Sequence, residues 1–494
     1  MEILFTHSYF IHFDPKEAKA HMPYPPLGTI TAAAALRAKG FSVGLHDVML
    51  STEEEEIFPV LQREHPRVVV IYDDSFNFLT KMCLSRMREA AFKLARFARE
   101  AGSTVIVFSS DASDHIEEYL SHDAQFVVCG EAEDALDELC HSLLRGTNHQ
   151  LSEIAGIAFA GPTGSIVRTP RRPPIQNLDK IPMAAWDLVD LDRYREVWVR
   201  HHGYFSLNIS TTRGCPFHCN WCAKPLYGQV YNSRSPEGVV EEMLVLKNLA
   251  SPDHLWITDD IFGLRPGWIQ TFDEIVNERD AKIPFKCLSR ADLLLKEDTI
   301  RHLKSAGCHT VWVGAESGSQ RVLDAMEKGT TISQIKESTR LLHSVGIRVG
   351  FFLQFGYPGE TRDDIEKTLQ LVKDCAPDEI GISVSYPLPG TPFHERVAAQ
   401  LGDKQNWDTS ADFDPMFQAT FSKEYYRMLH RVVHKKFSIW RGVRAFERLS
   451  RKPKTIDRRA LRSLASLIVH SLTLPHHLLL LRNEERSRGN HGAN

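Results

Sequence analysis

The chain has 494 residues, of which 43% are hydrophobic and 25% charged, and its formal net charge is −4. These values are ordinary for globular proteins, so they exclude a disordered or collagen-like chain, and the length predicts about three domains. Residues 421–494 contain 17 Lys and Arg against 5 Asp and Glu, a balance of +12, which leaves −16 for residues 1–420. The C-terminal segment is therefore a candidate attachment surface for an acidic partner.

The cysteine content and the chain ends predict a cytoplasmic protein. Nine cysteines are too few for a disulfide scaffold in a chain of this length. The N-terminus lacks a basic segment followed by a long apolar run, so we expect no signal peptide. The longest apolar stretch, Leu464–Leu481, is interrupted by His470 and Pro475 and is a poor candidate for a membrane span. Clustered cysteines are then interpreted first as metal ligands.

Residues 1–165 alternate between predicted strands and helices. Apolar strands such as Arg67–Tyr72 and Thr104–Phe108 are typical of a parallel sheet covered on both faces. We therefore expect an α/β, doubly wound (Rossmann-like) domain that binds ligands at the carboxyl ends of its strands. Its other expected elements are strands at Glu2–Thr6, Ser42–Leu45 and Phe126–Val128 and helices at Ile30–Lys39, Lys81–Ala101 and Ala132–Leu144.

Three further regions follow. Residues 166–200 are rich in Pro and Arg and are predicted to be a linker without regular elements. Residues 201–400 predict a partial (β/α)6 barrel with its chemistry at the strand carboxyl ends. Residues 401–494 predict a helical, basic C-terminal region. The expected barrel strands are Phe205–Ile209, Leu255–Thr258, Phe285–Leu288, Thr310–Val313, Gly350–Phe355 and Gly381–Val384, with helices between them such as Pro236–Leu249 and Ile332–Val345.

Three cysteines directly follow the first barrel strand. Cys215, Cys219 and Cys222 have Cys-x3-Cys-x2-Cys spacing, and thiolates suit iron–sulfur clusters or zinc. Three ligands without a fourth nearby would leave one iron of a four-iron cube open to a substrate or cofactor. The alternative is a structural zinc site completed by His218 or a distant cysteine. A zinc ribbon would normally supply a second ligand pair close by, and no further cysteine occurs before Cys287.

This cysteine pattern, with the aromatic Trp221 before the last cysteine, resembles the radical S-adenosylmethionine (SAM) superfamily. The resemblance extends to four later segments, each at the end of a predicted strand and in the expected order. They are Ser289–Asp292, Gly314–Ser319, Gly356–Thr361 and Tyr386–Pro392.

The resemblance implies that the open iron chelates SAM and that the cluster cleaves it reductively to a 5′-deoxyadenosyl radical. Glu316 would accept hydrogen bonds from the ribose or ammonium group, and Arg290 would donate to the carboxylate or ribose. Trp221 would pack on adenine or shield the cluster. For Arg290 and Glu316 the alternative is an ion pair at the barrel rim. No general acid or base is identified. The remaining implied SAM contacts are Asp260, Ser317 and Gly356. Asp260 could instead be a helix cap or form a loop salt bridge.

Two segments of the first domain, Tyr24–Gly28 and Val128–Glu133, resemble cobalamin-binding domains fused to radical SAM cores. The closest patterns are cobalamin-dependent radical SAM methyltransferases and the anaerobic magnesium-protoporphyrin IX monomethyl ester cyclase. The Asp-x-His-x-x-Gly motif of many cobalamin proteins is absent, and the turns Asp73–Asn77 and Ser109–His115 depart from the family pattern. The domain either binds cobalamin in a modified way or keeps the fold without it.

The resemblance implies cobalamin-dependent methylation of an unactivated carbon, with oxidative cyclisation as the alternative. A third hypothesis is a zinc-containing nucleic-acid module, but it leaves the later barrel motifs without a purpose, so we expect no nucleic acid. The implied partners are a small, hydrophobic substrate and an electron donor such as a reductase, flavodoxin or ferredoxin. The basic helix predicted at Tyr425–Phe437 either contacts an anionic membrane or packs on the barrel with its cations in solvent.

Overall fold

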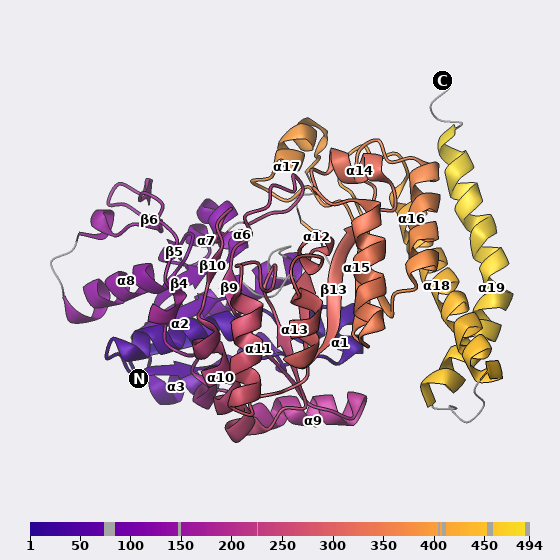
Figure 1. Cartoon of the computed structure of the whole chain (residues 1–494). Helices are drawn as coiled ribbons and strands as arrows, with labels where there is room; N and C mark the ends of the chain where they lie inside the picture. The colour runs from indigo at the N-terminus through magenta and orange to yellow at the C-terminus, as the bar shows by residue number, and fades with distance from the viewer. Residues whose placement is uncertain are drawn as a thin grey trace.

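The computed structural model describes residues 1–73, 84–146, 150–224, 226–403, 406–407, 412–451 and 458–489. An α/β unit that contains the N-terminus lies at one end of the molecule, a barrel-like sheet lies in the middle, and two long helices lie at the other end (Figure 1). Most of the turn Asp73–Asn77 falls outside the described residues.

The N-terminal sheet has seven strands. They are β1 (Ile3–Thr6), β2 (Val43–Leu45), β3 (Val68–Tyr72), β4 (Thr104–Phe108), β5 (Phe126–Val128), β6 (Ile157–Ala160) and β7 (Ile166–Arg168). Their order is β2-β1-β3-β4-β5-β6-β7; the first five are parallel and the last two antiparallel. The parallel part has the order of a flavodoxin-like doubly wound sheet, so the expected fold class is confirmed.

Helices cover both faces of this sheet. All of β3 is buried, and its successive side chains enter different cores: Val68 and Val70 belong to one apolar cluster, Val69 and Ile71 to the other. This explains why the strand is apolar at every position instead of alternating. The helices of this unit are α1 (Pro15–Ala20), α2 (Leu27–Ala38), α3 (Phe58–Glu64), α5 (Ser85–Glu100), α6 (Ser110–Asp114), α7 (Ile116–Ser121) and α8 (Glu133–Arg145).

The second sheet is a partial barrel of six parallel strands. In sheet order these are β8 (Ser206–Ile209), β11 (His254–Ile257), β12 (Phe285–Ser289), β13 (Cys308–Glu316), β14 (Arg348–Phe355) and β15 (Glu379–Val384). The sheet order equals the chain order, so all carboxyl ends meet at one rim, as the sequence predicted. The helices that follow its strands are α10 (Pro236–Ala250), α11 (Trp268–Glu278), α12 (Ala291–Leu294), α13 (Thr299–Ser305), α14 (Gln320–Ala325), α15 (Ile332–Ser344), α16 (Arg362–Cys375) and α17 (Pro392–Val397).

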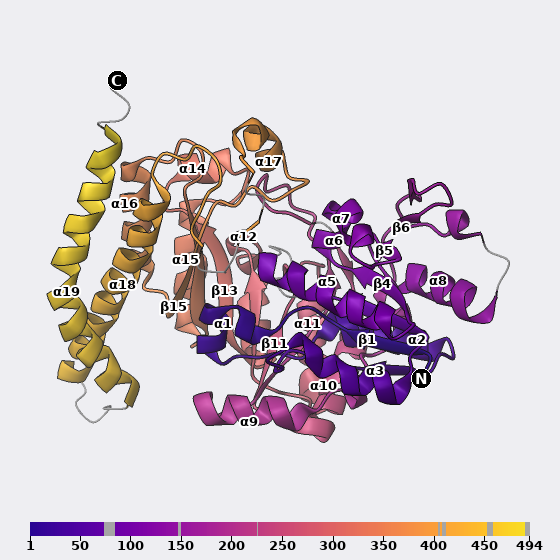
Figure 2. The same ribbon diagram turned by 180° about the vertical axis from the view of Figure 1, so that it is seen from behind.

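The prediction that residues 166–200 lack regular elements is wrong. The segment begins with β7 and ends in α9 (Leu191–His202), which lies below the barrel in both views (Figures 1 and 2). Tyr194 and Trp198 of α9 are buried, and Trp198 Nε1 donates to the Pro23 carbonyl at 2.7 Å. Its buried residues Leu191, Tyr194 and Trp198 are three and four positions apart, as on one face of a helix, but the proline-rich stretch before them obscured this pattern.

The C-terminal region is an antiparallel pair of helices, α18 (Lys423–Arg451) and α19 (Arg458–Gly489). Gly442 of α18 allows the close approach, because a Cβ there would lie 2.5 Å from Leu467 Cβ. Pro475 lies inside α19 and does not end the helix. Residues Arg462–Glu485 are long and apolar enough to cross a membrane by length and composition alone.

Candidate functional site

The cysteine loop lies at the carboxyl rim of the barrel, directly after β8. It begins at β9 (Thr212–Arg213), which pairs with β10 (Asn232–Ser233) in a short antiparallel ribbon. Gly214 follows with φ +80°, and a Cβ there would lie 2.4 Å from the Val230 carbonyl oxygen. A glycine is therefore needed at the point where the chain turns toward Cys215. Cys215 is buried, and Cys219 and Cys222 are partly exposed.

Asn220 holds the cysteine loop against the rest of the rim. Its Nδ2 donates to the Ala325 carbonyl at 2.8 Å, and its Oδ1 accepts from the Tyr357 hydroxyl at 2.9 Å. Its backbone N–H donates to Met326, and its carbonyl accepts from Phe393. Asn220 was not expected from the sequence, because its partners lie more than 100 positions away.

Asp259 anchors the start of the same loop from the end of β11. Its side chain is buried and accepts from the backbone N–H groups of Thr211 at 2.7 Å and Thr212 at 3.0 Å. Burial raises the pKa of this carboxyl to about 7. Asp260, the residue expected to contact the cofactor, is exposed. Burial raises the pKa of the Cys215 thiol, and the negative charge of the nearby Asp260 adds to this increase.

Arg290 lies beside the cysteines, immediately after β12. Its Nη1 donates to Cys219 Sγ at 3.9 Å, and its guanidinium lies 3.7 Å from the centre of the Phe217 ring. The side chain is buried and is paired with Asp292, with Nε 3.0 Å from Oδ1. Arg290 therefore places a buried positive charge directly beside the cysteine loop.

Glu316, at the end of β13, is the second buried charge of the rim. It has a φ of +56°, a conformation that is unfavourable for a non-glycine residue, and its Oε1 accepts from Lys328 Nζ at 2.9 Å. A Cβ at Gly314 would lie 2.6 Å from both partner atoms. Burial opposes the charge of Lys328, but Glu316 and Cys219 outweigh it and raise the pKa of the lysine.

The alternative of an Arg290–Glu316 ion pair does not describe this rim, because each residue pairs with a different partner. Lys328 was not anticipated from the sequence; it lies beyond α14, outside the strand-end segments. Its Nζ lies 5.9 Å from the centre of the Trp221 ring. Trp221 Nε1 is buried and has no hydrogen-bond partner among the described residues.

The other two expected SAM contacts are engaged within the fold. The buried Ser317 hydroxyl lies 3.2 Å from Thr368 Oγ1 of α16 and accepts from the Ser319 N–H. Gly356, at the end of β14, has a φ of +79°, and a Cβ there would lie 3.0 Å from the Tyr426 ring. Their backbone groups lie at the rim. The Ser317 side chain and the Cβ position of Gly356, however, face neighbouring helices.

A buried ion pair joins the cysteine loop to the N-terminal unit. Arg213 Nη1 donates to Glu131 Oε1 at 2.6 Å and to Glu133 Oε2 at 3.1 Å, and all three side chains are buried. Glu131 lies on the turn after β5, and Glu133 is the first residue of α8. The segment Val128–Glu133, whose pattern resembles a cobalamin domain, therefore contacts the residue two positions before Cys215.

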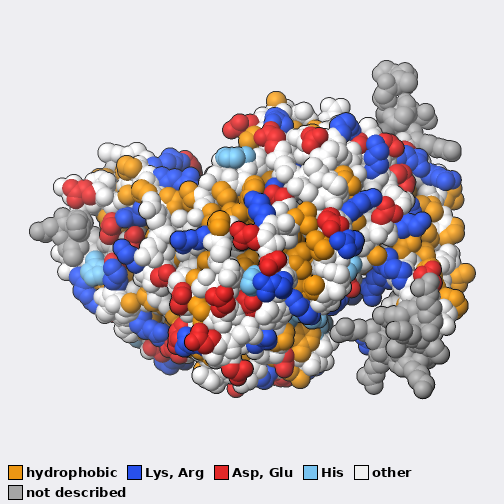
Figure 3. Space-filling view, in the orientation of Figure 1, with side chains coloured by type: hydrophobic (Ala, Val, Ile, Leu, Met, Phe, Trp, Pro, Cys, Tyr) orange, Lys and Arg blue, Asp and Glu red, His pale blue; other side chains and the backbone are white. Residues whose placement is uncertain are grey.

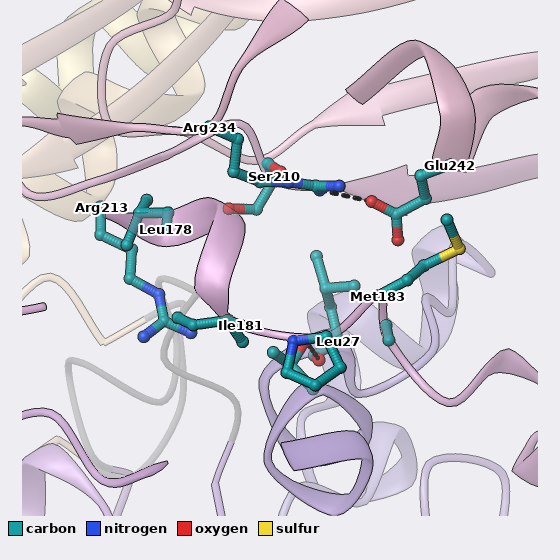
Figure 4. A pocket seen from close by; sticks show the side chains of 11 residues that line it. Leu27, Leu178, Ile181, Met183, Ser210, Arg213, Arg234 and Glu242 are labelled. Carbon is teal, nitrogen blue, oxygen red and sulfur yellow. Dashed lines mark hydrogen bonds and ion pairs between the residues drawn. The ribbon is translucent and has the colours of Figure 1, made fainter. Parts of the chain in front are cut away.

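Arg213 also lines a small pocket of about 40 Å³ (Figure 4). Leu27 of α2 and Met183 line it from one side, and Arg213 and Ser210 line it from the barrel side. Arg234 and Glu242 form an ion pair in its wall. A pocket of this volume holds a few water molecules and no organic cofactor.

Residues 209–372 match the family model of the radical SAM superfamily. The fold and the rim thus define a protein with a radical SAM domain, as the cysteine pattern predicted.

Comparisons with known proteins extend this likeness. The chain is 31% identical to an uncharacterized methyltransferase of Pyrococcus horikoshii over 59% of its own length and 62% of the relative's. It is 28% identical to the anaerobic magnesium-protoporphyrin IX monomethyl ester cyclase of Rubrivivax gelatinosus over 56% of its own length and 49% of the relative's. It thus spans less than two thirds of both relatives. The structure of the cobalamin-dependent SAM radical enzyme OxsB, with aqua-cobalamin and SAM bound, superposes with a TM-score of 0.71 at 18% identity, covering 97% of this chain and 72% of OxsB. That likeness is one of fold.

Proposed function

We propose that this chain is a radical SAM enzyme that holds a [4Fe–4S] cluster with Cys215, Cys219 and Cys222 and methylates an unactivated carbon with the help of cobalamin. The observation that carries the proposal is the position of Cys219. Its sulfur lies in a loop at the carboxyl rim of a parallel partial barrel, 3.9 Å from Arg290 Nη1.

The donor set fits a cluster better than a single ion. A zinc ion holds its thiolates at about 2.3 Å. No group of three His, Cys, Asp or Glu in the described part of the chain is placed to hold one metal ion. In a four-iron cube each thiolate binds a different iron, so the three sulfurs stand farther apart. Cys215, Cys219 and Cys222 would hold such a cluster, which would supply the electron for SAM cleavage and leave one iron open to SAM.

The buried charges of the rim fit the polar groups of SAM. Glu316 would accept hydrogen bonds from the ribose hydroxyls or the ammonium group, and Arg290 would donate to the carboxylate. Lys328 holds the Glu316 carboxylate in place through the 2.9 Å ion pair. The unpartnered Nε1 of Trp221 supplies one further donor. Buried polar groups that are already in position stabilise the charges of a bound cofactor without a further cost of reorganisation.

The N-terminal unit offers a site of the right kind for cobalamin. Doubly wound sheets bind ligands beyond the carboxyl ends of their strands. At that edge the hydroxyls of Thr6, at the end of β1, and Ser110, after β4, are buried without a partner among the described residues. These two hydroxyls are available for a polar ligand, and the Arg213 ion pair brings the same edge up to the cysteine loop.

Anaerobic reconstitution with iron and sulfide tests the proposal. The reconstituted protein should release 5′-deoxyadenosine from SAM when a one-electron reductant is added. Methyl transfer through cobalamin additionally requires S-adenosylhomocysteine, released only when cobalamin is present. If deoxyadenosine forms and S-adenosylhomocysteine does not, the alternative, an oxidative cyclisation such as the name of the R. gelatinosus relative describes, replaces methylation.

The remaining parts of the proposal concern partners. The enzyme would take a small-molecule substrate of hydrophobic character and accept electrons from a reductase, flavodoxin or ferredoxin in the cytoplasm. We also propose that the C-terminal helices contact a membrane. Residues 421–494 have a positive charge balance, and α19 contains a long apolar segment.

A further inference from the structure

The outer face of α19 exposes several large hydrophobic side chains. Leu472 is 77% exposed, and Ile468 is 63% exposed. On the neighbouring α18, Phe446 is 62% exposed. Isolated hydrophobic residues on a surface are common, but a row of them on one structural element indicates an interaction site. The exposed large hydrophobic residues of the two helices are Val443, Phe446, Ile468, Val469, Leu472 and Leu479.

The exposed residues of α19 fall on one stripe. Ile468, Leu472 and Leu479 follow each other at intervals of four and seven residues, which places them on the same side of a helix. Arg462 and Arg482 are exposed at the two ends of the stripe. Figure 3 shows hydrophobic side chains along the outer edge of the molecule over this helix, with Lys and Arg side chains beside them. Such a stripe can bury its apolar side chains in the headgroup–acyl boundary while the flanking cations contact anionic lipids.

The opposite side of α19 is held by the protein. Leu467 contacts α18 at Gly442, and Lys435 Nζ of α18 donates to Thr473 Oγ1 at 2.7 Å. Near the end of α19, Arg362 Nη1 of α16 donates to Glu485 Oε2 at 2.7 Å. A helix that crossed the bilayer would lose these contacts, whereas a helix lying flat keeps them and buries only its outer stripe.

From this geometry we propose that α19 docks in the plane of an anionic membrane, with Ile468, Leu472 and Leu479 in the headgroup–acyl boundary and Arg462 and Arg482 on lipid phosphates. The occupant is an anionic lipid surface because the segment 421–494 carries a balance of +12. The inference deepens the membrane contact proposed above and does not depend on the radical chemistry.

Flotation of the full-length protein with vesicles tests the docking. Vesicles of phosphatidylcholine with about one third phosphatidylglycerol should carry the protein to the top of a density gradient, and pure phosphatidylcholine vesicles should carry much less. Leu472→Glu should reduce the bound fraction at least tenfold, and Arg482→Gln should weaken binding about fivefold. Leu249→Glu is the matched control, because Leu249 is an exposed leucine on α10. It should bind like the parent.

Three results would overturn the proposal. If the Leu472→Glu and Leu249→Glu variants floated equally, the outer face of α19 would not be the membrane-binding surface. Protein that stays on the vesicles through a high-salt and alkaline wash would indicate a membrane-spanning helix. If the parent formed a dimer in analytical ultracentrifugation that Leu472→Glu dissociates, and did not bind vesicles, the face would bind a second copy of the chain. Release of 5′-deoxyadenosine, measured on the same samples without vesicles, tests the radical chemistry separately.

Discussion

Arg213 donates to Glu131 at 2.6 Å, and so connects the cysteine loop of the barrel to the turn after β5 in the N-terminal unit. The two residues are 82 positions apart. Both side chains are buried, and Glu133 completes the set of charges. The loop that carries the proposed cluster and the edge that carries the proposed cobalamin site are therefore not independent: a shift of one acts on the other through this ion pair.

Removal of Glu133 should destabilise the protein strongly. In Glu133→Gln the buried positive charge of Arg213 loses one of its two carboxylate partners. Breaking a buried ion pair costs about 3–5 kcal/mol of stability. The free energy of unfolding in urea measures the loss. The control is Glu117→Gln, which breaks an exposed ion pair with Arg168 and should leave stability within error of the parent. Similar losses in both variants would contradict the interdomain role of Arg213.

Cys219→Ala should abolish both iron binding and SAM cleavage. Two thiolates cannot hold the proposed cube in place of three, so the reconstituted variant should contain little iron and release no 5′-deoxyadenosine above background. Iron assay and chromatography measure these quantities. Cys375→Ala, at the end of α16, removes a thiol far from the loop in sequence and should keep both. A Cys219→Ala protein that still cleaves SAM at the parental rate would contradict the proposed site.

Glu316→Gln should weaken SAM binding about tenfold to a hundredfold. A hydrogen bond to a charged group contributes about 1.5–3 kcal/mol, and the variant loses that charge and leaves Lys328 buried without its anion. Equilibrium dialysis of reconstituted protein measures the affinity. Glu379→Gln changes a carboxylate at the start of β15, at the other end of the barrel, and should bind SAM like the parent. If both variants bound equally, Glu316 would have only a structural role.

Glu360 should make stability depend on pH. It is buried, its Oε2 accepts from the Gly356 N–H at 2.6 Å, and burial raises its pKa to about 8. The folded state keeps the proton that the unfolded state loses near pH 4.5, so this contribution to stability is complete below pH 4.5 and is lost as pH rises to about 8. The slope is at most about 1.4 kcal/mol per pH unit.

Glu360→Gln keeps an acceptor for the Gly356 N–H and cannot ionise. Between pH 5 and pH 8 the parent should therefore lose more stability than the variant, and the variant should be the more stable of the two at pH 8. Urea unfolding at these two pH values measures the difference. Parallel pH profiles would show that Glu360 is already ionised or does not control stability in this range.

The sequence alone was sufficient for the features that depend on local pattern. Apolar strands such as Thr104–Phe108 and the order of strands and helices predicted two parallel sheets, because strands buried on both faces must be apolar at each position. The spacing of Cys215, Cys219 and Cys222 predicted the proposed metal site, because the ligands lie within eight residues of one another.

Only the tertiary structure revealed the groups that support this loop. Asn220, Lys328 and the Arg213–Glu131 pair act through partners that are distant in sequence, and no local pattern distinguishes such residues from exposed polar ones. The helix α9 was missed for a different reason: its apolar residues have the spacing of a helix face, but they were grouped with the proline-rich segment that precedes them. Local chemistry determined which residues could bind a cluster, and packing between distant segments decided which charges surround it.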